Sequence, residues 1–460
     1  MKIKLLITGL LFILFGIFGW AESSWAATTN LPDCARTTVA SYVSSATAGD
    51  TLVCPDGTWD WSSGVSVTKP LTIKALNENG TYLRNNGGAY PTYTTLFSVG
   101  GTAGFYRISG FRVGSTETGG GSTWGMIQAN GVGTVFRFDH IYVDQTLSHG
   151  RSFTATNGAT GLIDHVRVTT GNSGGNIGGT LVRGKITTVP VADNWKIPTT
   201  WGDNTFVYFE DSYFEDSTGG SSDAFDCGDG GKYVVRYNTL VNWSIATHGP
   251  DSGDSCLAFE AYGNTMTQYS GTERVRPVWM FQFRGGTGKI YNNTIIGDWG
   301  SRGVQMTNYR SCENWFTRYG QTTSGSLYTT RGQCNGTWDN SQGGYSAYTY
   351  DGNKSPTETY RGYQCFEQAG QGGNRIPAPI YYWDNTLNGS PVTASVYDAS
   401  PETGTCYTSA HIQANRDYYN RAPQTGDATY PYTAYTYPHP LTGGSPDTTP
   451  PSAPTGLTIN

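Results

Sequence analysis

Charge is the property that this chain has least of. Only 14% of its 460 residues are charged, and the 35 acidic residues outnumber the 29 basic ones. A protein that binds nucleic acid needs a basic face to neutralise phosphates, so this balance argues against DNA or RNA as a partner. The chain also has no CxxC pair, no phosphate-binding glycine loop, no haem motif and no motif for a nucleophilic Ser or Cys. Those classes of site therefore have no support in the sequence.

Long hydrophobic runs are missing as well, except for one at the start. Residues 5–20 are almost all apolar, they follow the positively charged MKIK, and they precede Ser24-Trp25-Ala26, which suits a cleavage site. This pattern is typical of a bacterial secretory signal peptide over residues 1–26, with a retained membrane anchor as the alternative. No later segment is apolar enough to span a membrane. We therefore expect a secreted or cell-surface protein that makes no membrane contact after cleavage.

Glycine and aromatic residues are abundant, with 62 Gly, 31 Tyr and 13 Trp. They suit a fold with many tight turns and flat packed surfaces. The cysteines form an even set of eight, and in an exported chain disulfides are expected before metal ligands. These are Cys34, Cys54, Cys227, Cys256, Cys312, Cys334, Cys365 and Cys406. The connectivity stays open, but Cys34–Cys54 is the preferred pair, and Cys227–Cys256 would link neighbouring repeats.

One short pattern returns four times as alternating apolar and polar residues around an Asn or Asp and a small residue. The copies lie at 208–214, 235–241, 260–266 and 290–296. We take as anchors the small residues Ser212, Thr239, Thr265 and Thr294, which gives steps of 27, 26 and 29 residues. Alternation at period two indicates strands, and a fixed period in this range indicates stacked repeats. The pattern predicts a parallel β-helix, a coil whose successive strands stack about 4.8 Å apart.

Earlier and later copies extend the same series. Further anchors are Gly110, His140 and His165, and we interpret the two histidines as turn residues. Four asparagines occupy the same place in their repeats: Asn238, Asn264, Asn293 and Asn385. We expect them to form a ladder of stacked amides at a sharp turn.

The start of the mature chain resembles a known family. Residues 37–46 read as a short capping helix, and 48–61 and 65–76 carry GDT-x-x-x-P-x-G-T-aromatic and then TKPLTI. These features resemble the opening of pectate-lyase-like, right-handed parallel β-helix proteins. The resemblance implies a right-handed, all-β parallel coil, which we place over residues 27–441. The regular spacing fails for 92 residues after Thr294, which predicts a long cysteine-containing insertion at about 298–380. Residues 442–460 are a Pro- and Thr-rich linker that resembles the first strand of a fibronectin type III module. The oligomeric state stays open.

The densest charges of the chain fall on the repeats of Thr239, Thr265 and Thr294. Asp226, Asp254 and Arg276 are 28 and 22 residues apart, close to one repeat each, so they could stack in one column. The candidate catalytic residues are Asp226, His248, Asp254, Arg276 and Arg284. The candidate substrate-binding residues are Asp223, Asp251, Arg274 and Trp279. Stacked carboxylates repel unless a cation lies beside them, so Asp226, Asp229 and Asp254 are candidate ligands of Ca²⁺.

Two chemistries suit these residues, and a non-catalytic role is the alternative to both. In a polysaccharide lyase, Ca²⁺ or Arg neutralises a uronate while a base removes its C5 proton, and the family resemblance implies Arg276 or Arg284 as that base. In an inverting glycoside hydrolase, paired carboxylates act as acid and base, for which Asp223 and Asp226 are candidates. Polygalacturonase-like enzymes of this fold also carry a Gly-His-Gly and an Arg-x-Lys, which His248-Gly249 and Arg284 resemble loosely. The chain departs from both families because their contiguous motifs are absent. The alternative is a non-catalytic adhesin, carbohydrate-binding or matrix protein whose charges are structural.

Overall fold

The computed structural model describes most of the chain between the two ends. The described residues are 26–87, 94–116, 120–122, 125–170, 180–184, 195, 197–216, 223–249, 255–268, 279–299, 304–306, 367–396 and 412–443. The predicted signal peptide, the fibronectin-like end and Cys312, Cys334, Cys365 and Cys406 lie outside them and stay predictions. No helix in the described part is long and apolar enough to cross a membrane.

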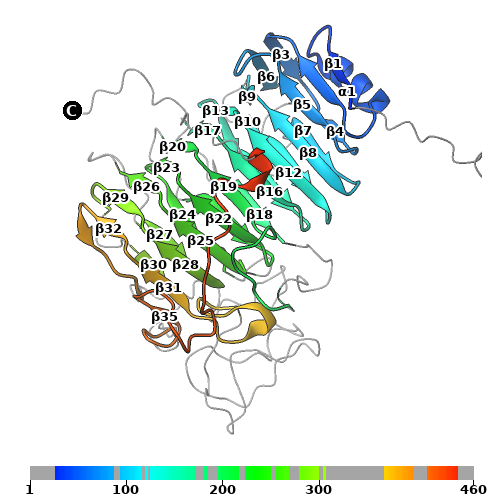
Figure 1. Cartoon of the computed structure of the whole chain (residues 1–460). Helices are drawn as coiled ribbons and strands as arrows, with labels where there is room; N and C mark the ends of the chain where they lie inside the picture. Colours follow the sequence, from blue (N-terminus) through cyan, green and yellow to red (C-terminus); the bar gives the residue numbers. More distant parts are fainter. Residues whose placement is uncertain are drawn as a thin grey trace, which may run out of the picture.

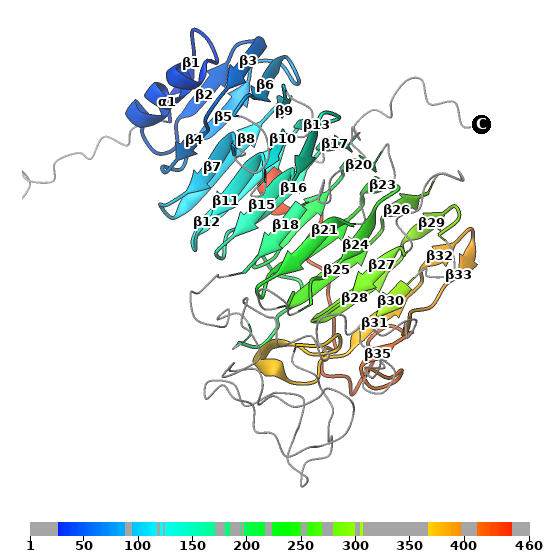
Figure 2. The same cartoon turned by 180° about the vertical axis from the view of Figure 1, so that it is seen from behind.

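The strands run almost entirely parallel and form three long sheets that share one coil (Figures 1 and 2). Each turn of the coil adds one strand to each sheet, so neighbours in a sheet come from successive turns. The chain folds as a parallel β-helix. The predicted fold class is therefore confirmed, while the right hand of the coil stays a prediction supported by the strong preference of parallel crossovers for it.

Sheet 1 has twelve strands. In spatial order they are β1 (Thr28–Asn30), β2 (Thr51–Cys54), β5 (Thr72–Ala75), β8 (Gly104–Ser109), β12 (Thr134–Asp139), β16 (Thr160–Asp164), β19 (Val207–Glu210), β22 (Lys232–Arg236), β25 (Ala258–Tyr262), β28 (Thr287–Tyr291), β31 (Ile380–Trp383) and β35 (Tyr418–Tyr419).

Sheet 2 has eleven strands, and the last of them runs antiparallel to its neighbour. They are β3 (Gly57–Trp61), β6 (Thr81–Asn85), β9 (Phe111–Ser115), β13 (Tyr142–Gln145), β17 (Arg167–Thr170), β20 (Tyr213–Asp216), β23 (Thr239–Val241), β26 (Thr265–Thr267), β29 (Thr294–Ile296), β32 (Thr386–Leu387) and β33 (Ser390–Pro391).

Sheet 3 has ten strands. They are β4 (Val65–Val67), β7 (Phe97–Gly100), β11 (Ile127–Asn130), β15 (Phe153–Thr156), β18 (Thr180–Arg183), β21 (Asp223–Gly228), β24 (Ser244–Ala246), β27 (Phe281–Phe283), β30 (Val304–Met306) and β34 (Ser395–Val396). A small separate pair joins β10 (Gly120–Ser122) to β14 (Ser148–Gly150). Strand β30 lies inside the range predicted as an insertion, and the pairing of β31 with β28 shows that the coil resumes at Ile380.

The turn between sheets 1 and 2 explains the repeat and corrects the alignment of its anchors. One residue of each turn adopts a left-handed backbone conformation, and this column contains Gly110, His140, His165, Asp211, Tyr237, Gly263, Asn292 and Asp384, with φ between 48° and 80°. The two histidines are thus turn residues, as predicted. The anchors Ser212, Gly110, His140 and His165 were wrongly aligned with Thr239: Tyr213 faces Thr239, and the other three lie level with Asp211 and Tyr237. Because Asp, Asn and His also tolerate the left-handed region, no single residue type marks this column.

The predicted asparagine ladder is confirmed. The Asn264 side-chain oxygen accepts from the Asn238 amide at 3.0 Å, and the Asn293 oxygen accepts from the Asn264 amide at 3.1 Å. Asn385 continues the series at 3.0 Å from the Asn293 amide, and Ser212 takes the first place by donating its amide to the Asn238 side chain. All four asparagines are almost completely buried, so each hydrogen bond replaces one that water cannot supply.

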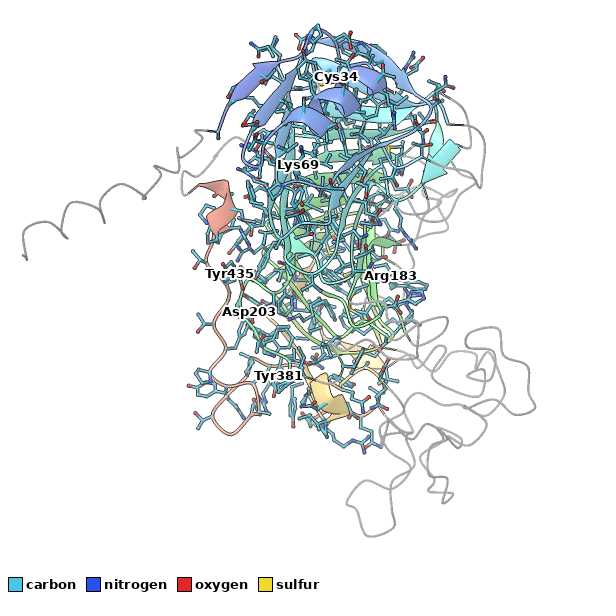
Figure 3. All side chains as sticks on the ribbon, turned by 90° about the vertical axis from the view of Figure 1, so that its right-hand side faces the viewer. Cys34, Lys69, Arg183, Asp203, Tyr381 and Tyr435 are labelled. Carbon is cyan, nitrogen blue, oxygen red and sulfur yellow. A yellow bond between two sulfur atoms is a disulfide. The ribbon has the colours of Figure 1, made fainter. Side chains whose placement is uncertain are left out.

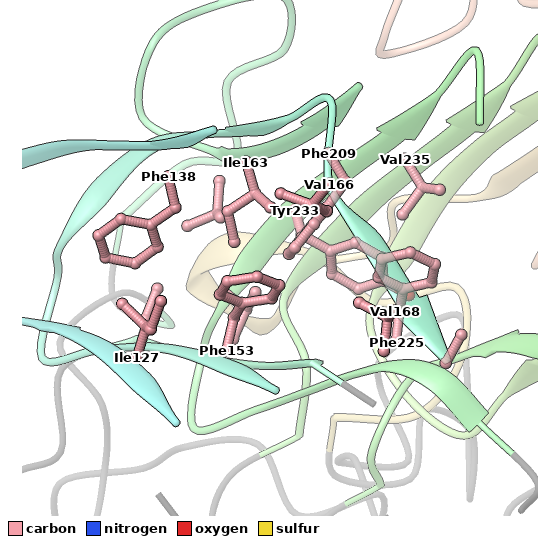
Figure 4. Packing of buried hydrophobic residues seen from close by; sticks show 14 of the residues in the cluster. Ile127, Phe138, Phe153, Ile163, Val166, Val168, Phe209, Phe225, Tyr233 and Val235 are labelled. Carbon is pink, nitrogen blue, oxygen red and sulfur yellow. The ribbon is translucent and has the colours of Figure 1, made fainter. Parts of the chain in front are cut away.

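The core fills the inside of the coil with apolar side chains from all three sheets (Figure 4). Phe138 of sheet 1 stacks on Phe153 of sheet 3 with ring centroids 6.1 Å apart, and Phe209 meets Phe225 edge to face at 4.9 Å. Helix α1 (Arg36–Ser45) caps the first turn and buries Val39 and Val43. The predicted disulfide Cys34–Cys54 joins the segment before this helix to β2.

A C-terminal strap, residues 430–442, lies along the outward face of sheet 1. Arg236 of β22 donates to the carbonyls of Tyr435 and Thr436 at 2.6 and 2.7 Å, while its Nε donates to Glu210 at 2.8 Å. Arg236 and Glu210 are both fully buried, so removing either would leave a buried charge at a cost of about 3–5 kcal/mol. Figure 3 shows Tyr435 of the strap and Arg183 of sheet 3 on opposite sides of the coil.

Candidate functional site

The predicted charge cluster lies on the outward face of sheet 3. Along β21 the side chains alternate: Phe225 and Cys227 point into the core and are buried, while Asp226 between them points outward with 21% of its side chain exposed. The period-two geometry of a strand forces this alternation. Asp226 is therefore placed at the surface by the two core residues that flank it.

Three of the predicted residues meet at this point. The His248 ring, through Nδ1, lies 2.9 Å from Asp226 Oδ2, and the Arg284 guanidinium lies 3.4 Å from Asp226 Oδ1. These residues are 22 and 58 positions from Asp226 in the sequence. The His248 side chain is 26% exposed and that of Arg284 is 9% exposed. The structure thus assembles a carboxylate, an imidazole and a guanidinium from three successive turns of the coil.

Backbone contacts fix both partners of Asp226. Arg284 donates from Nε to the Thr247 carbonyl at 2.6 Å, and its amide donates to Thr247 Oγ1 at 2.9 Å. The amide of His248 donates to the Cys227 carbonyl at 2.8 Å, and the His248 carbonyl accepts from the Cys256 amide at 3.0 Å. The predicted disulfide Cys227–Cys256 is present, so it encloses the turn that carries His248.

The electrostatic balance keeps Asp226 ionised. Burial by itself would raise the pKa of Asp226, but the charge of His248 when its ring is protonated, the charge of Arg284, and the hydrogen bonds from His248 and the Cys227 amide outweigh it and hold the pKa well below its usual range. An ionised carboxylate accepts hydrogen bonds and cannot donate one. Nδ1 of His248 must therefore carry the proton of that contact, which leaves Nε2 as the basic nitrogen of the neutral ring.

Two further arginines lie near Asp226 and add positive charge to this face. Arg183, at the end of β18, lies 3.5 Å from Asp229. Burial, reinforced by the charge of Arg183, lowers the pKa of Arg151 to about 10, and the charge of Asp226 acts in the opposite direction. His248 and Arg284 thus contact Asp226, Arg183 contacts Asp229, and Arg151 adds a further positive charge, in a chain whose net charge is −6. This arrangement suits an anionic ligand.

The other candidate residues are not seen to join Asp226, His248 and Arg284. Asp251, Asp254, Arg274 and Arg276 lie outside the described residues, so the predicted column of Asp226, Asp254 and Arg276 stays a prediction. Asp223 begins β21, but its side chain is not described. Trp279 is half-buried, and its indole nitrogen is buried with no hydrogen-bond partner among the described residues. Trp243 and Trp299 are buried core residues and present no ring face to a sugar.

Sequence reasoning missed Thr247, Arg151 and Arg183. Thr247 carries no chemical signal, because it acts through its carbonyl and hydroxyl on the backbone and side chain of Arg284. The arginines could have been noticed, since charges are scarce and Arg183 ends an expected strand. Their relation to Asp226 depends on the pairing of β18 with β21, where Leu181 faces Asp226.

The described residues do not by themselves form a calcium site. In the described ranges no group of three His, Cys, Asp or Glu side chains is placed to hold a metal ion. Asp226 faces His248 and Arg284, and Asp229 faces Arg183, so each carboxylate already has a cationic partner. Calcium usually takes six to eight oxygen ligands. Calcium therefore stays a prediction that depends on Asp254.

The similarity of this chain to known proteins is weak. One similar solved structure is an alginate lyase from Paenibacillus sp. str. FPU-7, with a TM-score of 0.39 and 13% identity over 60% of this chain and 89% of that chain. No family model matches the sequence. No curated protein matches it either. The function must therefore be argued from the residues on sheet 3.

Proposed function

We propose that the protein is a secreted enzyme that cleaves an acidic polysaccharide by β-elimination on the outward face of sheet 3. The observation that carries this proposal is the contact of His248 and Arg284 with the ionised Asp226. A base with a fixed tautomer and a cation beside it are the two groups that proton abstraction next to a carboxylate requires. The excess of arginine around them suits a uronate chain.

Each residue has a role in this mechanism. Arg284, whose guanidinium lies 3.4 Å from Asp226, neutralises the uronate carboxylate, which makes the C5 proton more acidic. His248 removes the C5 proton through Nε2. The C4–O bond then breaks, a C4–C5 double bond forms, and the leaving oxygen takes a proton from water. Asp226 holds the ring and stabilises the imidazolium that forms.

The family resemblance favoured an arginine as the base, and the geometry supports His248 instead. Arg284 donates to the Thr247 carbonyl and pairs with Asp226, which suits the role of a fixed cation and not that of a base. Hydrolysis is supported less well, because it needs a carboxylic acid whose pKa is raised. The pKa of Asp226 is lowered, and Asp229 pairs with Arg183. We therefore place elimination before hydrolysis.

A panel of acidic and neutral polysaccharides tests the proposal. Elimination gives a 4,5-unsaturated product that absorbs in the ultraviolet, whereas hydrolysis gives new reducing ends without this absorbance. The panel is assayed with and without a chelator, and restoration by calcium alone would place a metal in the reaction. New reducing ends without absorbance would overturn elimination. Binding without any product would support the carbohydrate-binding alternative.

A further inference from the structure

Glu367 is a buried carboxylate behind the candidate site that no sequence pattern singled out. Its side chain is fully buried and its backbone is left-handed, with φ of 54°. A non-glycine residue keeps this conformation only where its surroundings impose it. Its Oε2 accepts from the Ser255 amide at 2.7 Å, and its carbonyl accepts from Ser255 Oγ at 3.0 Å. Glu367 and Ser255 therefore fix each other across 112 residues of sequence.

Ser255 transmits this constraint to His248. The residue after Ser255 is Cys256, which is bonded to Cys227 and donates its amide to the His248 carbonyl at 3.0 Å. The Cys227 amide in turn donates to Asp226 Oδ1 at 2.9 Å. A displacement of Ser255 would thus reach both members of the Asp226–His248 pair through at most two peptide units and one disulfide.

The same segment also holds the backbone that follows Arg284. The Gly286 amide donates to the Gln368 carbonyl at 3.2 Å, and the Gly286 carbonyl accepts from the Gly370 amide at 2.8 Å. A Cβ atom on Gly285 would lie 2.6 Å from Ser255 Cβ and 2.7 Å from the Glu367 carbonyl oxygen. Only glycine fits in this space. Residues 367–370 and Ser255 therefore clamp the chain directly after Arg284.

We propose that Glu367 is a positioning residue, which sets the orientation of His248 on Asp226 and the place of Arg284 by holding Ser255. In this role Glu367 acts on His248 and Arg284 through Ser255 and the backbone around it. The catalytic consequence rests on the proposed function. The orientation of His248 is independent of the proposed function, because it can be measured on the full chain without any substrate.

Nitrogen NMR of the full-length protein with labelled histidines tests the proposal, since it reports which ring nitrogen carries the proton. In the parent a charge-assisted contact with Asp226 should favour the Nδ1–H form of neutral His248 about tenfold or more. In Glu367→Ala this preference should fall severalfold, and kcat on any cleaved polysaccharide should fall about tenfold or more with a small change in KM. His248→Ala identifies the signal.

Two conservative variants separate geometry from charge and cover the case in which Glu367→Ala does not fold. Glu367→Gln keeps an oxygen in reach of the Ser255 amide and should resemble the parent. Glu367→Asp keeps the charge but is shorter by about 1.5 Å, so it should behave like Glu367→Ala. Asp139→Ala is the matched control: it removes an equally buried carboxylate on β12 and should leave the His248 signal unchanged.

The outcomes are distinct for the two proposals. A parental His248 signal in folded Glu367→Asp would overturn the positioning role, whatever the enzyme does. An altered signal in Asp139→Ala of the same size would also overturn it, because a general loss of stability would then explain the change. A parent that cleaves nothing but shows the expected NMR pattern would leave the positioning role intact and defeat the proposed reaction.

Discussion

Asp226→Asn is the substitution that tests the candidate site most directly. It keeps the shape of the side chain and removes its charge. Arg284 offers only donors, so the amide oxygen of the new Asn should turn toward it and place the NH₂ group against His248. Nδ1 of His248 must then accept a hydrogen bond, which puts the ring proton on Nε2. The proposed base would be in the wrong tautomer.

The size of the effect follows from these contacts. General base catalysis contributes about 10²–10⁴-fold, so kcat should fall by at least about 10²-fold, while KM changes little because Arg284 remains. The loss of a charge-assisted hydrogen bond should also lower the free energy of unfolding by about 1–3 kcal/mol. Ultraviolet absorbance of the unsaturated product measures the first effect, and urea unfolding measures the second.

Asp144→Asn is the matched control for this experiment. It removes the same charge from a carboxylate of β13 on sheet 2, which pairs with Arg112 at 2.6 Å and takes no part in the candidate site. Its rate should stay within about threefold of the parent, as expected for a partly exposed ion pair. If Asp226→Asn cleaves polysaccharide at the parental rate and with the parental pH profile, Asp226 does not hold the base and the mechanism is wrong.

Three further predictions concern the frame of the site. Replacing Cys227 and Cys256 together by Ser should lower the free energy of unfolding, measured in urea, by about 2–4 kcal/mol. Turnover should also fall, because the disulfide encloses the turn that carries His248, and unchanged turnover would contradict this role of the disulfide. Asn264→Ala should lower the free energy of unfolding by about 2–5 kcal/mol in chemical unfolding, since it leaves buried donors and acceptors of Asn238 and Val235 without a partner. Asn77→Ala, which removes an exposed hydrogen bond to Asp56, should cost less than about 1 kcal/mol. Burial alone would raise the pKa of Asp139, but Arg107, His140 and Arg137 lower it below its unfolded value of 3.8. The ionised Asp139 should therefore stabilise the fold fully above pH 3.8, and this stabilisation should be lost as the pH falls below that value. Asp139→Asn should flatten this part of the curve of unfolding free energy against pH, and an unchanged curve would refute the reasoning.

Local features of the coil could be predicted from the sequence because they repeat within each turn. Alternating residues around 208–214 and 290–296 gave the strands, and Asn238, Asn264 and Asn293 gave the ladder, since a shared position in each repeat becomes a shared column in space. The pair Cys227–Cys256 was predicted from its spacing of about one repeat, whereas Cys34–Cys54 was preferred because it closes the entry segment of the coil. The alignment failed at Ser212, where Asp211 takes the left-handed position that a glycine would have marked.

Only the tertiary structure decided which side chains become neighbours on the outer surface of the coil. Asp226, His248 and Arg284 were all candidates, but their meeting depends on connections of unequal length and on a register shift between Asp223 and Phe225. The strap places its carbonyls on Arg236 from about 200 residues away, and Glu367 holds Ser255 across 112 residues. Periodicity records the spacing along one turn. Periodicity does not specify the length or the path of the connections between strands. Contacts made by loops and distant segments are therefore visible only in the folded structure.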